Sequence, residues 1–248
     1  MKKILKFLIP KFILRMKNKF IASRTRKEFL NKSQKDIFKT IYSKKMWAGE
    51  KEKKYKFYSG LGSHSEELTN KYIIELRNFL QSFPKKPNVV DLGCGDFAIG
   101  SKIRDKCDRY YGIDIVDELI EENKKKFRNL SVEFLSLDIT NDQLPSADIC
   151  TVRLVLQHMS NESIHKFIKN INNKYKFLIV TEHFPSPEKF VPNINKPSGS
   201  DTRFYDNSAV DLNAPPFNLK IIDMKDLCDC SSDLIEGSLK TKILQLSI

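Results

Sequence analysis

The chain has 248 residues, 40% of them hydrophobic and only 9 of them glycine, which suits one sizeable globular domain with an appendage. This composition excludes fibrous, collagen-like and wholly disordered proteins. The formal net charge of +12 is uneven, since residues 1–57 carry a net +15 and the remaining residues a net −3, which excludes a basic surface spread over the whole chain.

Residues 1–57 are predicted to form a basic amphipathic N-terminal extension, in which lysine is interleaved with Phe, Ile and Leu. Such a segment packs one apolar stripe on the following domain, lies on an anionic membrane surface through residues 1–20, or grips an RNA backbone. The lysine content shows that the segment is positively charged but does not identify what it contacts, so these three interpretations stay open. Lys6 and Lys11 interrupt the first apolar stretch and no small-residue cleavage site follows, so we expect no secretory signal.

No apolar stretch approaches the roughly 20 residues that a transmembrane helix needs. We therefore expect a cytoplasmic protein, with peripheral contact at the inner face of the membrane as a further option. The five cysteines are an odd number, and the one close pair, Cys228 and Cys230, has neither a second pair nor a nearby histidine. This spacing predicts neither a disulfide framework nor a metal site.

Residues 58–248 are predicted to form one α/β domain. A helix that begins near Ser65 carries apolar residues four apart and ends before Pro84 and Pro87. Beyond it, strands are predicted at 88–91, 109–114, 132–138, 148–153 and 177–181, and helices at 99–107, 118–127 and 161–171. This alternation predicts a doubly wound parallel sheet with helices on both faces and ligands beyond the carboxyl ends of the strands.

The last part of the chain departs from this alternation. Residues 219–224 and 240–248 are predicted strands with no long helix between them, which indicates an antiparallel pair. The segment 184–217 is rich in Pro, Asn and Ser and is too long for a simple connector. Long irregular segments beside a sheet are typical of lids and substrate loops.

The stretch 89–98 is the strongest functional signal, because an apolar strand ends in Asp91 and is followed by Gly93 and Gly95. Glycines at such a turn let a ligand approach the backbone closely. The spacing also fits a dinucleotide fingerprint, but Asp91 and Asp96 would repel a pyrophosphate at the helix N-terminus. The same negative field suits a ligand that carries a sulfonium and an ammonium group.

Two more acids follow the next two strands. Asp114, before Ile115, can accept both hydroxyl protons of a ribose, and Asp138, before Ile139, can accept a hydrogen bond from an adenine amino group. Each acid alone could equally cap the helix that follows it. Three acids at three consecutive strand ends beside a glycine turn favour an adenosine-containing ligand.

With Asp91-Leu92-Gly93-Cys94-Gly95 as its first motif, the sequence resembles the class I S-adenosylmethionine-dependent methyltransferases over roughly residues 58–183. The resemblance implies a Rossmann-like seven-stranded sheet, mostly parallel with an antiparallel last strand, S-adenosyl-L-methionine as cofactor, and methyl transfer by in-line displacement. Phe97 stands where the family often has a third glycine, so either the helix begins farther from the ligand or Phe97 contacts it. The predicted cofactor-binding residues are Asp91, Gly93, Cys94, Gly95, Asp96, Phe97, Asp114, Ile115, Asp138, Ile139 and Arg153.

A narrower resemblance lies in residues 47–50, 59–63 and 153–159. These stretches look like a bacterial subgroup associated with surface-polysaccharide biosynthesis, in which the segment before the domain folds over the cofactor. By composition alone, the Gly/Ser stretch 59–63 is equally typical of a flexible linker.

Methyl transfer to a hydroxyl needs a base. His158, just beyond the fourth strand, is the first candidate, and bracing of the next helix is its structural alternative. Glu182 and His183 end the fifth strand and could orient the substrate or act as the base instead. An acceptor oxygen that is already an anion would need no base.

Arg203 with Tyr205 in the long loop, together with Arg153, could bind an anionic acceptor or make ordinary salt bridges. The region after the fourth strand lacks the Asp/Asn-Pro-Pro-aromatic motif of amino-base methyltransferases. We therefore predict O-methylation of a small polar metabolite or of a surface-glycan precursor, such as one for capsule or lipopolysaccharide. The alternatives are an RNA methyltransferase that uses the basic extension and a non-catalytic cofactor-binding protein of the same fold, for which Phe97 is the hint.

Overall fold

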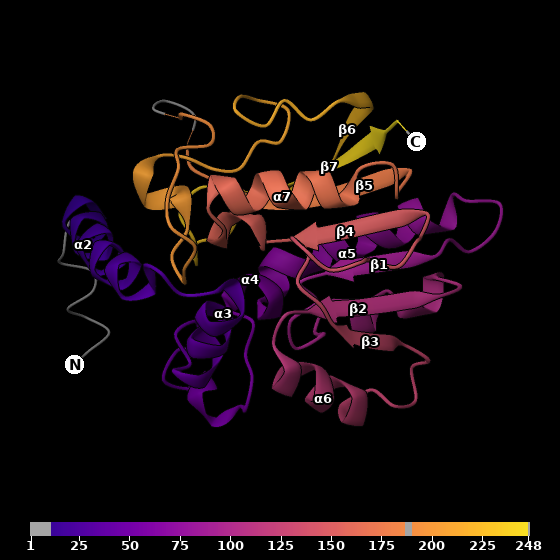
Figure 1. Cartoon of the computed structure of the whole chain (residues 1–248), viewed down its shortest axis with the longest axis horizontal. Coiled ribbons are helices and arrows are strands. Elements are labelled where there is room, and N and C mark those ends of the chain that lie inside the picture. Colours follow the sequence, from indigo (N-terminus) through magenta and orange to yellow (C-terminus); the bar gives the residue numbers. More distant parts are fainter. Residues whose placement is uncertain (1–10, 187–189, 248) are drawn as a thin grey trace.

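The computed structural model describes residues 11–186 and 190–247, which form a seven-stranded mixed sheet with helices on both faces (Figure 1). The strands are β1 (Val89–Leu92), β2 (Tyr110–Asp114), β3 (Glu133–Ser136), β4 (Ile149–Arg153), β5 (Phe177–Phe184), β6 (Ile221–Cys230) and β7 (Ser238–Leu246). Their order is β3-β2-β1-β4-β5-β7-β6, in which β1 to β5 pair in parallel and β7 runs antiparallel to both of its neighbours. The predicted fold class and the antiparallel last pair are confirmed.

The described helices are α2 (Lys11–Phe29), α3 (Gln34–Ser43), α4 (Leu61–His64), α5 (Glu66–Gln81), α6 (Asp117–Lys126) and α7 (Asn161–Ile171). Local sequence sets where α7 begins, because the Ser160 hydroxyl accepts a hydrogen bond from the Ser163 amide at 3.2 Å and so satisfies a free amide of the first turn. Helices α5 and α7 lie on opposite faces of the sheet (Figure 1).

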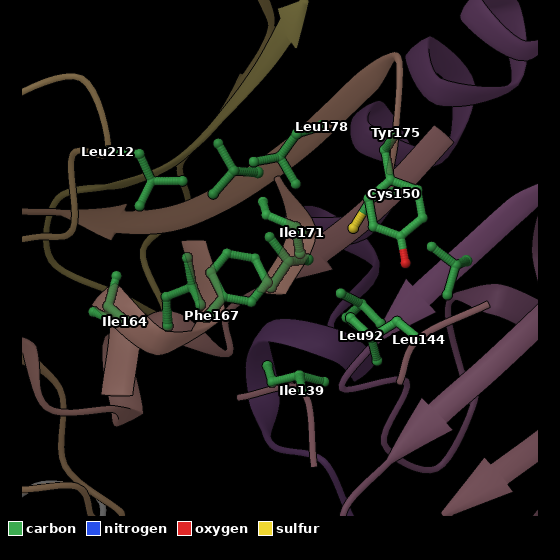
Figure 2. Close-up of a cluster of buried hydrophobic side chains, with 14 of the residues drawn as sticks. Leu92, Ile139, Leu144, Cys150, Ile164, Phe167, Ile171, Tyr175, Leu178 and Leu212 are labelled. Carbon is green, nitrogen blue, oxygen red and sulfur yellow. The ribbon is translucent and has the colours of Figure 1, made fainter. Parts of the chain in front are cut away.

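The core has two halves because successive strand residues point to opposite faces of the sheet. Val89 and Ile149 belong to the buried cluster under α5, whereas their neighbours Val90 and Cys150 belong to the cluster under α7. Figure 2 shows the second cluster, in which α7 residues spaced three and four apart face the strands. The α7 residues of this cluster are Ile164, Phe167 and Ile171, each with 0% exposure.

Two predicted elements differ from the structure. Residues 99–107 form two short 3-10 turns, at Gly100–Lys102 and Arg104–Lys106, rather than one helix. Glycine and serine at positions 100 and 101 are weak helix formers. The strand predicted at 132–138 is shorter, because Asp138 turns the chain by accepting hydrogen bonds from Thr140.

The described part of the N-terminal extension packs against the domain. Tyr42 of α3 is buried in one cluster with Val116 and Leu119, which lie at the start of α6. Ion pairs on the same interface join Lys35 to Asp117 at 2.8 Å, Lys39 to Glu118, and Lys56 to Glu122 at 2.7 Å. Three lysines of this segment therefore pair with acids of α6.

The core under α7 supplies a test of the packing. Phe167→Ala removes a fully buried ring between α7 and the sheet, so the free energy of unfolding should fall by about 3–5 kcal/mol in urea denaturation. Ile74→Ala, on α5 but 56% exposed, is the control and should change it by less than about 0.5 kcal/mol. Equal effects of the two changes would contradict this packing.

Candidate functional site at the carboxyl edge of the sheet

A cavity of about 290 Å³ lies beyond the carboxyl ends of β1, β2, β3 and β4, where the sequence places its ligand. Most of the predicted site residues line this cavity, and the lining residues are called the cavity wall below. Those that line it are Gly93, Cys94, Gly95, Asp114, Ile115, Asp138, Ile139, Arg153 and His158. Predicted residues outside its lining are Asp91, Asp96, Phe97, Glu182 and His183.

The turn after β1 requires its glycines. Gly93 and Gly95 have φ of 79° and 55°, in the left-handed region that side chains disfavour. A Cβ atom on Gly93 would lie 2.4 Å from the Val155 side chain, and one on Gly95 would lie 2.2 Å from the Ser59 hydroxyl oxygen. The turn is therefore packed from β4 on one side and from the extension on the other.

Asp114 ends β2 inside this wall. Its two carboxylate oxygens accept hydrogen bonds from the backbone amides of Gly95 and Val116, each at 3.1 Å. Burial raises the pKa of Asp114 to about 6. Asp138, in contrast, accepts from the Thr140 amide and hydroxyl at 2.8 and 2.7 Å, so it caps the turn after β3 as well as lining the cavity.

Asp91 and Arg153 lie side by side at the ends of β1 and β4. Asp91 accepts hydrogen bonds from the Thr151 and Tyr110 hydroxyls at 2.9 and 3.0 Å, and burial raises its pKa to about 6. It lines a hollow of about 30 Å³ that shares Gly93 and Arg153 with the main cavity, rather than the main wall itself.

Arg153 lines both the main cavity and this hollow, and two of its donors are unused. Its Nη2 donates to the Gly62 carbonyl at 2.8 Å, and its guanidinium lies 4.9 Å from the centre of the Tyr72 ring. Its buried Nε and Nη1 atoms have no hydrogen-bond partner within the described part of the chain. Because unpaired buried donors are costly, this fork is a site for an anionic group of a ligand.

Asp96 and Phe97, which the sequence predicts to bind the cofactor, do not line the cavity. Asp96 accepts a hydrogen bond from the Ser59 amide at 3.2 Å and contacts the His64 ring at 2.6 Å, so it ties the extension to the turn. Phe97, at 0% exposure, packs edge-on against three other rings in the core under α5. Those rings are Tyr110, Phe127 and Phe134.

His158 sits on the wall in the short turn after β4. Its Nδ1 lies 3.3 Å from the Asp201 carbonyl oxygen and must donate, so Nε2 is the acceptor, 3.3 Å from the Gln157 amide nitrogen. The Trp47 ring lies over it with centres 4.9 Å apart. Burial, aided by the charge of Lys196, lowers the pKa of His158 to about 3, so the ring is neutral at physiological pH.

Glu182 and His183, the other candidate bases, do not line this cavity. The predicted strand ends at 181, but β5 continues to Phe184 because Glu182 and His183 pair with β7. His183 donates to the Glu236 carbonyl at 2.7 Å and stacks on Phe204. Glu182 is 2% exposed and lines a separate hollow of about 20 Å³.

Arg203 is also unavailable to an anionic acceptor. It is 1% exposed and donates to four backbone carbonyls and one side chain, which holds the long loop against the turn that carries His158. The acceptors are the carbonyls of Ile194, Leu156, Gln157 and Met159 and the Asn161 side-chain oxygen.

The sequence missed several residues of the wall. Gln34, Phe38 and Tyr42 come from α3, and Gln157 comes from the turn beside His158. The amide oxygens of Gln34 and Gln157 are buried without a hydrogen-bond partner among the described residues, so they can accept from a ligand. Apart from the narrower resemblance at 47–50 and 59–63, no local signal indicated that the extension closes the site.

Comparison with known proteins agrees with this geometry. Residues 89–176 match a family model described as a methyltransferase domain, whereas a search of curated proteins finds no match. The N-methyltransferase NodS from Bradyrhizobium japonicum WM9, solved with S-adenosyl-L-homocysteine, has a TM-score of 0.58 at 14% identity, over 83% of this chain and 98% of that chain. Human N-acetylserotonin methyltransferase, solved with S-adenosyl-L-methionine, has a TM-score of 0.56 at 15% identity, over 90% of this chain and 62% of that chain. A SAM-dependent methyltransferase from Leishmania major has a TM-score of 0.53 at 16% identity, over 75% and 76%.

The donor set of the wall fits the cofactor of this fold. S-adenosyl-L-methionine carries a carboxylate, which the two unpaired Arg153 donors complement, and ribose hydroxyls, which the Asp114 carboxylate complements. Gly93 and Gly95, which have no side chain, also line the cavity. Residues 89–176 thus match a methyltransferase domain, and the residues that line the cavity fit S-adenosyl-L-methionine.

Glu182 gives a pH-dependent stability test. Burial raises its pKa to about 8 from an ordinary value of 4.5, so between these pH values the folded state keeps a proton that the unfolded chain has released. Stability is therefore lost as pH rises through this window. Glu182→Gln cannot ionise and should melt about 5 °C or more above the wild type at pH 8.5, with the difference shrinking toward pH 5, in thermal unfolding scans.

The matched control for this test is Glu67→Gln, because Glu67 is exposed on α5. The melting difference between Glu67→Gln and the wild type should stay constant from pH 5 to 8.5. A constant difference for Glu182→Gln as well would contradict a buried, protonated Glu182.

Proposed function

We propose that this chain is an S-adenosyl-L-methionine-dependent methyltransferase that transfers the cofactor's methyl group to a hydroxyl oxygen of a small polar metabolite or a surface-glycan precursor. The observation that carries the proposal is the neutral His158 ring on the cavity wall. Its Nδ1 donates to the Asp201 carbonyl, so Nε2, which lies 3.3 Å from the Gln157 amide nitrogen, is the basic nitrogen of the ring.

In this proposal, different residues of the cavity wall bind different parts of the cofactor. Asp114 accepts the ribose hydroxyls, Asp138 accepts from the adenine amino group, and Arg153 pairs with the carboxylate. The backbone of the turn passes beneath, where Gly93 and Gly95 carry no side chain and Cys94 lines the cavity. Asp91, behind Arg153, supplies negative charge for the ammonium group through the adjoining hollow.

The bound cofactor supplies an electrophilic methyl group, so the chain itself must hold the acceptor oxygen in line and receive its proton. Gln157 offers an unpartnered amide oxygen beside His158 that can orient the hydroxyl. Nε2 of His158 then takes the proton, and the Asp201 carbonyl stabilises the charged ring through Nδ1–H. The lowered pKa of His158 means that the base form is present throughout the neutral range.

The charge of the wall favours an uncharged acceptor group. Arg153 is the one Lys or Arg among the described residues that line the cavity, and the proposal assigns it to the cofactor. An anionic acceptor would therefore face Asp114 and Asp138 without a cation to pair with. This supports a neutral hydroxyl, such as that of a sugar, as the methylated group.

The RNA alternative is less well supported. It depends on the basic extension, where Lys35, Lys39 and Lys56 already pair with acids of α6. The hint for a non-catalytic protein was Phe97, and its ring belongs to the core. Membrane contact through residues 1–20 falls largely outside the described side chains, and no described helix is long and apolar enough to cross a bilayer.

Asp114 tests the cofactor site. Asp114→Asn keeps the shape but loses the charge, so the dissociation constant for S-adenosyl-L-methionine should rise about 10- to 100-fold in calorimetric titration. Wild-type affinity should also weaken below about pH 6, where the carboxylate gains a proton, and this pH dependence should diminish in the variant. Asp233→Asn, at an exposed position, is the control; unchanged affinity in Asp114→Asn would remove the ribose role.

Labelled methyl donor and fractionated cell extract test the acceptor class. The label should enter the small uncharged fraction, and His158→Gln should lower that turnover on the order of 100-fold while cofactor affinity stays within about twofold. Because the pKa of His158 is about 3, wild-type turnover should show no inflection near pH 6.5 from this ring. Label in RNA, or undiminished turnover in His158→Gln, would refute the respective part of the proposal.

A further inference from the structure

The immediate surroundings of His158 come from a segment far along the chain. The Gly199 amide donates to the His158 carbonyl at 2.9 Å, and the Asp201 carbonyl accepts from Nδ1 of the ring at 3.3 Å. The position of the His158 ring, and the nitrogen that carries its proton, therefore depend on where residues 199–201 lie. This segment belongs to the long loop after β5 and has no regular secondary structure of its own.

The N-terminal extension holds that segment at three consecutive residues. The Phe29 ring packs so closely on Gly199 that a Cβ atom there would lie 3.2 Å from it. Nε1 of Trp47 donates to the Ser200 carbonyl at 3.0 Å. Nε of Arg26 donates to the Asp201 carboxylate at 2.8 Å.

The Arg26 contact is part of a largely buried charge cluster. Nη2 of Arg26 also donates to Asp206 at 2.6 Å, and the Asp201 side chain is only 6% exposed. Lys196, whose side chain is fully buried, lies 3.7 Å from the other Asp201 oxygen. Ion pairs shielded from water in this way are screened little by salt, so loss of one partner leaves a buried charge uncompensated.

We propose that Arg26 and Trp47 are positioning residues for His158, and that the extension sets the orientation and tautomer of the imidazole through Ser200 and Asp201. This rests on the proposed role of His158 as the base. Neither residue needs to touch the acceptor for this role: Arg26 acts through the Asp201 side chain, and Trp47 acts through the Ser200 carbonyl and its own ring over the imidazole. The extension is then part of the catalytic apparatus and not only a cover.

The direct test is the protonation state of the imidazole nitrogens in the full-length protein, measured by ¹⁵N NMR with His158→Gln for assignment. The wild type should show His158 as one neutral tautomer with the proton on Nδ1. Arg26→Gln and Trp47→Phe should each show a mixture of tautomers, because the Asp201 carbonyl is no longer fixed. This readout needs neither cofactor nor acceptor.

Turnover supplies the second measurement. Arg26→Gln should lower kcat by about tenfold or more while its dissociation constant for S-adenosyl-L-methionine stays within about twofold, since Arg26 is not on the cavity wall. Arg26→Lys should recover part of kcat, because it keeps a charge beside Asp201. Lys27→Ala, at the exposed neighbouring position on α2, is the matched control and should match the wild type.

A single Nδ1–H tautomer and an unchanged kcat in both Arg26→Gln and Trp47→Phe would overturn the proposal. If Arg26→Gln fails to fold, Trp47→Phe decides alone, because it keeps an aromatic ring at this position and removes the donor to Ser200. A shifted tautomer in these variants, combined with undiminished turnover in His158→Gln, would support the positioning and refute the base. The two proposals can therefore fail separately.

Discussion

The turn from Gly93 to Gly95 is the constraint on which the rest of the site depends. Gly93 and Gly95 both have positive φ angles, and the Val155 and Ser59 side chains fill the space that Cβ atoms on them would need. The Gly95 amide also orients Asp114. This turn therefore forms part of the cavity lining and positions the Asp114 carboxylate. It is also where Ser59, just after the extension, packs against Gly95.

The docking of the extension combines weak and strong interactions. The ion pairs between α3 and α6 are about half exposed, and such pairs contribute at most about 1 kcal/mol each. Burial of Ile41 and Tyr42, which are nearly inaccessible to water, contributes more per residue. The charges on this surface therefore select the orientation of the extension, while apolar contacts and the buried Arg26 pair hold it in place.

His158 illustrates how burial, together with a nearby cation, keeps an imidazole ring neutral. A ring removed from water and near Lys196 stays neutral, and a carbonyl acceptor selects which nitrogen holds the proton. Arg203 holds this geometry by joining the long loop to three residues that flank His158, namely Leu156, Gln157 and Met159. The loop predicted to be a lid or substrate loop thus supplies the support of the proposed base.

The sequence by itself determined the fold class and the edge of the sheet that carries the site, because strand and helix periodicities are local and parallel strands end at one edge. It also placed Asp114, Arg153 and His158 near one another, since each follows or ends a strand. Only the tertiary structure decided which acids face the cavity: Asp91 and Asp96 are drawn into hydrogen bonds with Thr151 and Ser59, residues distant in sequence.

Pairing with β7 likewise carried Glu182 into the sheet, and aromatic packing drew Phe97 into the core. The closure of the site by α2 and α3 depends on contacts as far apart in sequence as Arg26 and Asp201. Interactions of this kind follow from how surfaces meet in three dimensions, and no local pattern of residues encodes them.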